Sequence, residues 1–319
     1  MANEIKAYSD IYKLVEKARR ERKAESNIDD LMREVIDAGT PTHLNLPDYP
    51  ERGILPVILN LSSLFTPLGK RYKRQIVEKV ELVHLWKMCD IKYSGYQLDE
   101  SDRDVLMAII KTGMKERIGD TVTINRRRLL QMVRPNGKTF GRTDYDWLWE
   151  SLLRLKFGVL EIDLKYRNGD RLVIGKRIAF SLLICVAEDA DSGKIEIRFD
   201  PRVAQLFEKN QYTLINIEKR AKLTMLLAKS IHSLISASKE KTQTYKLSFL
   251  TEKHGYHLPE YKVVIKLNKA CEDLKQAGII EGYEWHKNKE GVKSLTLVKV
   301  DDPVAGDPAV IEDLAEIVE

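Results

Sequence analysis

The chain contains one order of secondary-structure elements twice, and this repeat limits its possible folds more than any other feature of the sequence. Each copy is expected to run helix, short strand, helix, turn, third helix and β-hairpin. The two third helices end in similar sequences, Leu-Lys-Phe-Gly-Val-Leu-Glu at 155–161 and Leu-Lys-Gln-Ala-Gly-Ile-Ile-Glu at 274–281. Such a repeat indicates two related modules in tandem.

The first copy begins with a helix that Asp99 or Ser101 can cap. Its further expected elements are a strand at 121–124, a helix at 126–133, a turn at 134–141, a third helix at 142–156, and strands at 159–166 and 172–187. The dipeptide Asn168-Gly169 lies between the last two strands and is typical of a tight hairpin turn. We therefore expect the first hairpin to span 159–187.

The second copy repeats this order toward the end of the chain. Its expected elements are a strand at 194–199, helices at 218–236, 248–254 and 259–277, a short strand at 244–247, and hairpin strands at 279–285 and 292–298. Helix, short strand, helix, turn, helix and hairpin is the order of a winged helix-turn-helix module.

The expected fold class is therefore α+β, with two tandem winged helix-turn-helix domains, an N-terminal helical arm and a flexible acidic C-terminal tail. Four prolines and a glycine between residues 41 and 56 indicate a linker before the first domain. The expected boundaries are 1–56 for the arm and linker, 57–190 for the first winged-helix domain, 191–299 for the second, and 300–319 for the tail.

Charge is distributed unevenly along the chain. The whole chain carries a net charge of +5, and residues 300–319 contribute seven acidic side chains and no basic one, so residues 1–299 carry +12. A basic body of this kind favours a polyanionic partner such as nucleic acid. Solubility alone is the alternative explanation.

Three scattered cysteines, Cys89, Cys185 and Cys271, form neither a CxxC motif nor a recognisable disulfide framework. The longest nearly apolar run, residues 178–187, is too short to span a bilayer, and the N-terminal sequence lacks an apolar signal core. These features predict a cytoplasmic protein with no membrane partner.

The third helix of the second module carries the clearest candidates for DNA contact. Its expected core face holds Val264, Leu267, Cys271 and Leu274, and three lysines lie on the opposite side: Lys262, Lys266 and Lys269. Such a face suits phosphate contacts, although it also suits simple solvation. Tyr261 lies near the helix start, where helix-turn-helix proteins reach base edges.

In the first module we expect only the N-terminal end of the third helix to meet DNA, because acidic side chains follow beyond its first turn. The candidates there are Lys138, Thr139, Arg142, Thr143 and Asp146; an aspartate can accept a hydrogen bond from cytosine. A second group of candidates begins the preceding helix and suits phosphate binding: Arg126, Arg127 and Arg128. A third group lies at the tip of the second hairpin: Lys287, Lys289 and Lys293.

No catalytic or metal-binding pattern is recognisable, so we expect a non-enzymatic protein with no cofactor and no metal. Gly137-Lys138-Thr139 lacks the earlier glycine of a phosphate-binding loop, since Met132 occupies that position. The six histidines form no His-Glu-x-x-His or His-apolar-His motif, and no Gly-x-Ser-x-Gly motif is present.

Several phrases, in their order and spacing, resemble those of the TrfA-type plasmid replication initiators, and more distantly those of other iteron-binding Rep initiators. They cover residues 62–298: Ser-Leu-Phe-Thr at 63–66, Arg-Pro-Asn-Gly at 134–137, Ala-Gln-Leu-Phe at 204–207 followed by Tyr-Thr at 212–213, and Ala-Cys-Glu-Asp-Leu-Lys at 270–275 followed by Ala-Gly at 277–278.

The resemblance implies two winged-helix domains that bind direct repeats, called iterons, at a plasmid origin. It also implies opening of AT-rich DNA, binding of AT-rich single strands, recruitment of the host replicative helicase and host initiator, and a monomer–dimer equilibrium linked to copy control. Such initiators can carry a short peptide that binds the sliding clamp, and residues 60–65, Asn-Leu-Ser-Ser-Leu-Phe, are the nearest match here. A structural strand is the alternative explanation for that segment.

Two further classes of function remain open at this point. A double winged-helix transcriptional repressor would need the same DNA-reading surface as an initiator. A nicking or joining enzyme would need metal ligands and a positioned nucleophile, which the sequence does not reveal.

Overall fold

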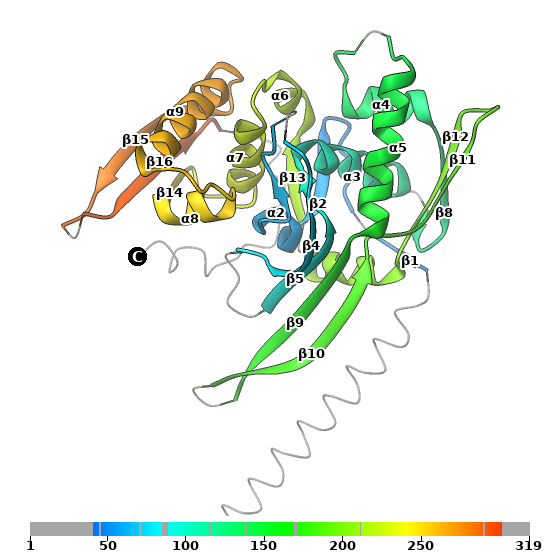
Figure 1. Cartoon of the computed structure of the whole chain (residues 1–319), viewed down its shortest axis with the longest axis horizontal. Coiled ribbons are helices and arrows are strands. Elements are labelled where there is room, and N and C mark those ends of the chain that lie inside the picture. Colours follow the sequence, from blue (N-terminus) through cyan, green and yellow to red (C-terminus); the bar gives the residue numbers. More distant parts are fainter. Residues whose placement is uncertain are drawn as a thin grey trace, which may run out of the picture.

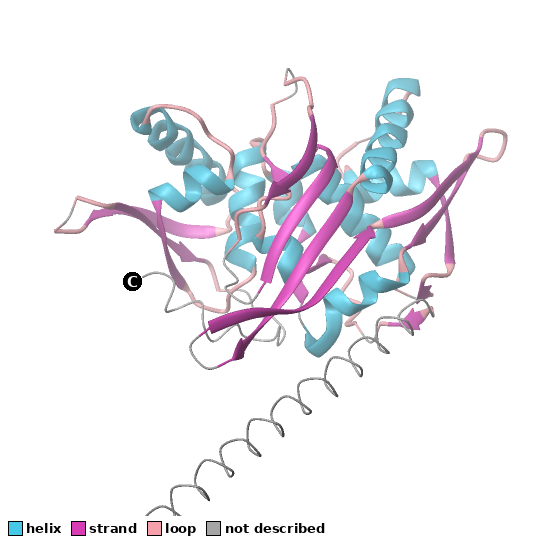
Figure 2. Cartoon of the chain, turned by 60° about the horizontal axis from the view of Figure 1, so that its bottom comes forward, coloured by secondary structure: helices cyan, strands magenta, loops and turns pink. Residues whose placement is uncertain are grey.

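The computed structural model describes residues 41–301 except 45, 70–71, 85–88, 115, 138, 169–170, 211 and 290. The expected arm over residues 1–40 and the acidic tail beyond residue 301 lie outside the described residues. Two winged-helix modules lie on opposite sides of the described part of the molecule, and each projects a β-hairpin outward (Figures 1 and 2). The expected α+β fold of two tandem winged helices is confirmed.

The first module contains the three expected helices and the short strand between them. These are α3 (Glu100–Gly113), β8 (Thr121–Asn125), α4 (Arg126–Val133) and α5 (Arg142–Phe157). Asp99 caps α3 by accepting hydrogen bonds from the backbone N–H groups of Ser101 and Asp102, at 2.8 and 3.1 Å. Asn125 caps α4 through the N–H of Arg127 at 2.9 Å. Polar caps at these positions satisfy backbone donors that have no partner inside the helix.

The wing of the first module is not the expected hairpin. The strand β8 pairs with β12 (Lys194–Phe199), which pairs with β11 (Leu183–Asp189), so the wing spans 183–199. Ile195 and Ile197 of β12 face Ile124 and Val122 of β8, and all four side chains are buried. The strand that we expected to open the second domain thus completes the first, and the expected boundary at 190 is wrong.

The hairpin expected as the wing belongs to a separate four-stranded sheet. Its order is β10 (Arg171–Ser181), β9 (Val159–Asn168), β5 (Cys89–Tyr96) and β4 (Ile76–Glu81), and Figure 2 shows this sheet between the two modules. The side chains of Ile91, Leu160, Ile162 and Phe180 are buried in the first core, which α3 and α5 also line. The β9–β10 hairpin is therefore an insertion between the third helix and the wing, and it pairs with strands that precede α3.

The compact part of the chain begins before residue 57. The strand β2 (Arg52–Pro56) pairs with β13 (Tyr212–Asn216), which follows the 3₁₀ helix η1 (Pro201–Asn210), and Ile54 and Leu55 are buried. The expected linker therefore ends inside the first core. Two small pairs complete the described first module: β1 (Thr42–His43) with β7 (Arg117–Ile118), and β3 (Phe65–Thr66) with β6 (Leu98–Asp99).

The second module follows the expected order with one break. Its elements are α6 (Ile217–Lys222), α7 (Leu226–Ser236), β14 (Thr242–Lys246), α8 (Leu247–Lys253), α9 (Glu260–Gln276), β15 (Ile280–Lys287) and β16 (Lys293–Lys299). The helix expected at 218–236 is interrupted at 223–225, where the carboxylate of Asp273 accepts hydrogen bonds from the N–H groups of Thr224 and Met225, each at 2.9 Å. This carboxylate ties the break before α7 to α9.

A short helix, α2 (Val57–Leu61), joins the two cores. Ile58 and Leu59 pack in the first core, whereas Val57 and Leu61 pack in the second. The first core continues to Ile215 and the second begins again at Leu223, so the boundary between the modules lies within α6. The same helix therefore belongs to both hydrophobic cores.

The segment 60–65, considered above as a clamp-binding peptide or a strand, is the end of α2 followed by the short strand β3. The exposed fractions of Asn60, Leu64 and Phe65 are 0%, 3% and 1%. A peptide that binds a partner protein must expose its side chains, so this fold favours a structural role. The expected continuous strand is wrong.

Candidate nucleic-acid interface

The start of α5 is fixed by contacts within the turn that precedes it. The guanidinium of Arg134 pairs with Asp144 at 2.6 Å, and Asp144 also accepts the N–H of Gly141 at 3.0 Å. The hydrogen bond from Gly141, reinforced by Arg134, lowers the pKa of Asp144. Arg134 also lies over the ring of Trp147, 4.2 Å from its centroid. Trp147 thus packs against Arg134, and the turn holds the first residues of α5 in one position.

Most of the predicted contacts on α5 lie at its exposed N-terminal end. The side chain of Arg142 is 94% exposed and that of Asp146 68% exposed, and their charged atoms are 3.9 Å apart. Thr139 and Thr143 are also exposed, whereas Lys138 lies outside the described residues. These side chains are free to meet a ligand at the helix start.

Two polar side chains further along α5 are tied inward. Arg154 is 11% exposed and binds Asp102 of α3 at 2.8 Å. Ser151 donates to the same carboxylate at 2.6 Å. The guanidinium of Arg154 is therefore not available to DNA.

The three arginines at the start of α4 differ in their environment. Arg126 binds Glu188 of the wing at 2.8 Å and lies over the ring of Tyr145, 4.3 Å from its centroid. It thus joins α4, α5 and the wing, and with its side chain 32% exposed, its contact with phosphate stays a prediction. Arg127 and Arg128 are exposed.

The core face of α9 is rotated from the expected one. Val263, Leu267, Ala270, Cys271 and Leu274 are buried, whereas Val264 is only half-buried. At about 100° per residue, the side directly opposite carries Tyr261 and Ile265, which are 63% and 50% exposed. Sequence reasoning missed Ile265, because it assigned Val264 to the core in place of Val263 and left out Ala270, although Leu267, Cys271 and Leu274 are buried as expected.

The three lysines of α9 form a stripe along one flank of the helix. Lys262, Lys266 and Lys269 are all exposed, about 80–140° from the middle of the core face. The Nζ atom of Lys266 lies 5.6 Å from the ring centroid of Tyr256, in the turn before α9. We call Lys262, Lys266 and Lys269 the lysine stripe. The lysine stripe lies next to Tyr261 on the helix surface. It does not form a separate face directly opposite the core.

The second wing is attached to the other flank of α9. The indole N–H of Trp285 donates to Asn268 at 2.8 Å, and Lys293 pairs with Glu260 at 2.6 Å. Lys293 is therefore partly neutralised, while Lys287 and Lys289 stay exposed near the tip. The lysine stripe, the outer face of α9 and this tip together form a basic surface.

The first wing has the opposite character. Its tip lies between Asp189 and Gly193, and Asp189 accepts hydrogen bonds from the hydroxyl of Ser192 at 2.7 Å and from the N–H of Asp191 at 3.0 Å. The bonds from Ser192, followed by that from Asp191, lower the pKa of Asp189, so the carboxylate is charged. With Asp191 exposed beside it, this tip repels phosphate.

Among the described residues, no group of three or more His, Cys, Asp or Glu side chains is placed to hold a metal ion. His254 and His257, three residues apart, differ in their environment, since His254 is buried and His257 is exposed. The chemistry of the described surface is that of charged, hydroxyl and aromatic side chains on two third helices and one wing.

These features define a DNA-binding protein with two winged helices in tandem. The chain belongs to the TrfA protein family, whose model matches residues 41–292. It is a plasmid replication initiator.

Two solved structures are similar to this chain. The match to domains 2–3 of RctB has 13% identity and a TM-score of 0.49, and covers 77% of this chain and 97% of that one. The match to the Pi initiator protein, solved in complex with iteron DNA, has 15% identity and a TM-score of 0.44, and covers 64% of this chain and 94% of that one. No curated protein sequence matched the chain.

Proposed function

We propose that one chain of this initiator binds a direct repeat at a plasmid origin with α5 and α9 in successive major grooves. The observation that supports this most is that both third helices expose polar side chains at their N-terminal ends, in modules joined by the shared helix α2. Helix-turn-helix proteins read base edges from this end of the third helix.

The two kinds of side chain suggest two tasks. Arg142, Thr143, Asp146 and Tyr261 are placed to read base edges, because each lies in the first turns of a third helix. The lysine stripe, Arg127, Arg128, Thr139, Lys287 and Lys289 suit phosphate contacts, which fix the register of the protein on DNA. Lys138 belongs to the same proposal by its position in the sequence.

The further steps of initiation are proposed from the family resemblance. They are opening of AT-rich DNA, binding of the resulting single strands, and recruitment of the host helicase and initiator, in the cytoplasm. A monomer–dimer equilibrium would regulate them. The burial of residues 60–65 argues against a clamp-binding role for that segment.

We also propose that the protein acts by binding alone. The described residues present no metal-binding cluster, and their exposed polar groups suit DNA contacts more than catalysis. Incubation of origin DNA with magnesium or manganese tests this: intact strands are expected, and specific cleavage would require an active site that we have not assigned.

Hydroxyl-radical footprinting on the DNA beside the gene tests the binding mode. We expect regularly spaced direct repeats, each protected in two patches on one face of the duplex about 10 bp apart. A single inverted operator would instead support the transcriptional repressor. Protection confined to one groove per chain would remove one module from the interface.

A further inference from the structure

The boundary between the two modules contains a buried arginine that binds both. Arg220 of α6 is 2% exposed. It donates hydrogen bonds to Asp104 at 2.5 Å and to Glu100 at 2.8 Å, both on α3 of the first module. It also donates to the hydroxyl of Ser233 at 2.9 Å and to the carbonyl of Lys229 at 2.7 Å, both on α7 of the second module. One guanidinium therefore bridges the helices that support α5 and α9.

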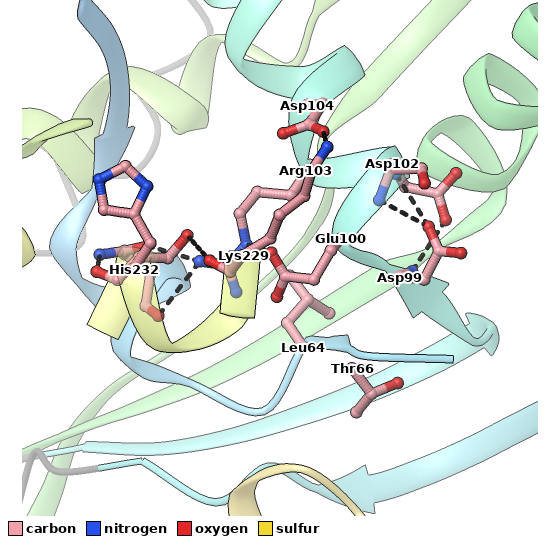
Figure 3. A network of polar contacts seen from close by, with 12 residues as sticks. Leu64, Thr66, Asp99, Glu100, Asp102, Arg103, Asp104, Lys229 and His232 are labelled. Carbon is pink, nitrogen blue, oxygen red and sulfur yellow. Dashed lines mark hydrogen bonds and ion pairs between the residues drawn. The ribbon is translucent and has the colours of Figure 1, made fainter. Parts of the chain in front are cut away.

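Other charged and polar groups close the same contact. Lys229 pairs with Asp104 at 2.6 Å, and Arg103 pairs with Glu100 at 3.1 Å (Figure 3). Asn60 of the shared helix accepts from Arg103 at 2.5 Å and donates to the carbonyl of Ser233 at 2.6 Å. We call Asn60, Glu100, Arg103, Asp104, Arg220 and Lys229 the inter-module cluster.

A cluster of this kind is better suited to fixing an orientation than to adding stability. The cost of removing charges from water offsets much of the attraction between buried ion pairs. Their hydrogen bonds nevertheless require particular distances and angles, and a forked arginine with two carboxylates has few equivalent arrangements. The apolar contacts of Val57 and Leu61 at the same boundary are non-directional and tolerate small rotations.

We propose that Arg220, together with Asp104 and Glu100, sets the distance and rotation between α5 and α9 and thereby the spacing that the initiator accepts between the two halves of its binding site. These are positioning residues, buried away from the proposed DNA contacts. The inference rests on the proposed function, in which both helices bind one duplex. Each inserted base pair moves one half-site by about 3.4 Å and about 34° relative to the other, so a fixed pair of helices accepts one spacing.

The test variant is Asp104→Asn/Arg220→Met, which removes a buried positive and a buried negative charge together. Glu100 keeps Arg103 as its partner, and Lys229 has a side chain that is 18% exposed and can reach water. A matched control is Asp163→Asn/Arg177→Met, which removes an arginine–aspartate pair of 2.6 Å on the separate four-stranded sheet. Thermal melting establishes that both variants are folded.

The first measurement is independent of DNA. Spin labels at Glu150→Cys on α5 and Gln276→Cys on α9 report the distance between the two third helices by double electron–electron resonance. The background carries Cys185→Ser, since Cys185 is half-buried while Cys89 and Cys271 are buried. We expect one narrow distance distribution for the wild type and the control, and a clearly broader or shifted one for the test variant. Equal distributions in all three would overturn the proposal.

The second measurement uses the footprinted repeat and versions with one or two base pairs inserted between its protected halves. We expect insertion to weaken wild-type and control binding by about tenfold or more, because one module loses its base contacts. In the test variant, the same insertion should lower the affinity by less than about threefold, and the variant should still prefer the repeat to unrelated DNA. An insertion penalty equal to that of the wild type would refute the role of the cluster. Failure of the wild type to prefer the repeat would instead contradict the proposed function.

Discussion

The two modules share one fold but present different chemistry to a DNA partner. The first reaches outward with the initial turns of α5 and with a wing whose tip is acidic, whereas the second offers the lysine stripe, Tyr261 and a wing with two exposed lysines. A repeated fold thus does not repeat its electrostatics. If the proposed function holds, we expect both modules to read sequence and the second module to supply most of the attraction to phosphate.

The modules also differ in their buried titratable groups, and this difference predicts the largest effect. Burial, with Arg220 nearby, lowers the pKa of His232 to about 3, and burial beside Lys253 does the same for His254. Both are therefore neutral in the folded second module, while an unfolded chain binds protons below about pH 6.5. The contribution of each histidine to the free energy of unfolding is therefore fully present above pH 6.5 and is lost as the pH decreases toward 3. At pH 4 the loss is on the order of 3 kcal/mol per histidine.

Amide hydrogen exchange, corrected for intrinsic rates, should show α9 losing protection before α5 as the pH falls from 6.5 to 4. The variant His254→Phe keeps a ring in the buried site, so the protection of α9 should depend less on pH in this variant. Earlier loss in α5 would show that the first module is the acid-sensitive one.

The next effect concerns the lysine stripe. Changing Lys262, Lys266 and Lys269 to Ala should weaken specific and non-specific binding together and reduce the slope of log K against log salt by roughly 2–3 units. All three side chains are exposed, so the core is retained. The charge-matched control changes Lys73 and Lys92 to Ala and Lys79 to Asn, because Lys79 has a φ of 48° that Asn tolerates. Equal salt slopes for the stripe variant and the wild type would mean that the stripe does not meet the DNA backbone.

Base-reading residues should behave differently from the stripe. Arg142→Ala and Tyr261→Ala should each cost about 1–3 kcal/mol on the preferred repeat and relax the choice of base at one position. Their effect on non-specific DNA should be small. Selection of binding sites from a randomised repeat measures this, and a uniform loss over all sequences would reclassify either residue as a phosphate contact.

The smallest effects should come from the wings. Asp191→Lys gives the first wing a basic tip and should raise affinity by less than about tenfold, with a steeper salt dependence. Lys289→Asp in the second wing should lower affinity by a similar factor. If Lys289→Asp leaves binding unchanged at low salt, the second wing stands away from DNA and the contrast between the wings has no role in affinity.

The repeat of elements was predictable because it depends on local patterns. Apolar spacing, Asn125 as a cap and the turn signals each act over a few residues, and they place the helices of both modules correctly apart from the break at 223–225. The start of α5 and the lysines of α9 were likewise found as exposed sites. Their contact with DNA stays a prediction.

The structural features that the sequence did not reveal depend on contacts between residues far apart in the sequence. The Asn168-Gly169 turn signal is genuine, yet only pairing of β9 with β5 and of β12 with β8 decides which hairpin is the wing. The ion pair of Arg126 with Glu188 was not foreseen because the two residues are 62 positions apart. Arg220 and Asp104 are 116 residues apart, and nothing in either neighbourhood indicates the other.

The pairing of β2 with β13 has a consequence for how this protein emerges from the ribosome. Leu55 meets Thr213, so the first core stays open at one edge until nearly all of that module has been made. At about 5–20 residues per second, the strand at residues 52–56 waits for roughly 8–30 s of synthesis before its partner appears. By then translation has reached α6, where Arg220 lies. The rest of the second module, up to Lys299, then needs roughly 4–17 s more of synthesis, so the first core can close its last strand before the second module is available to attach to it.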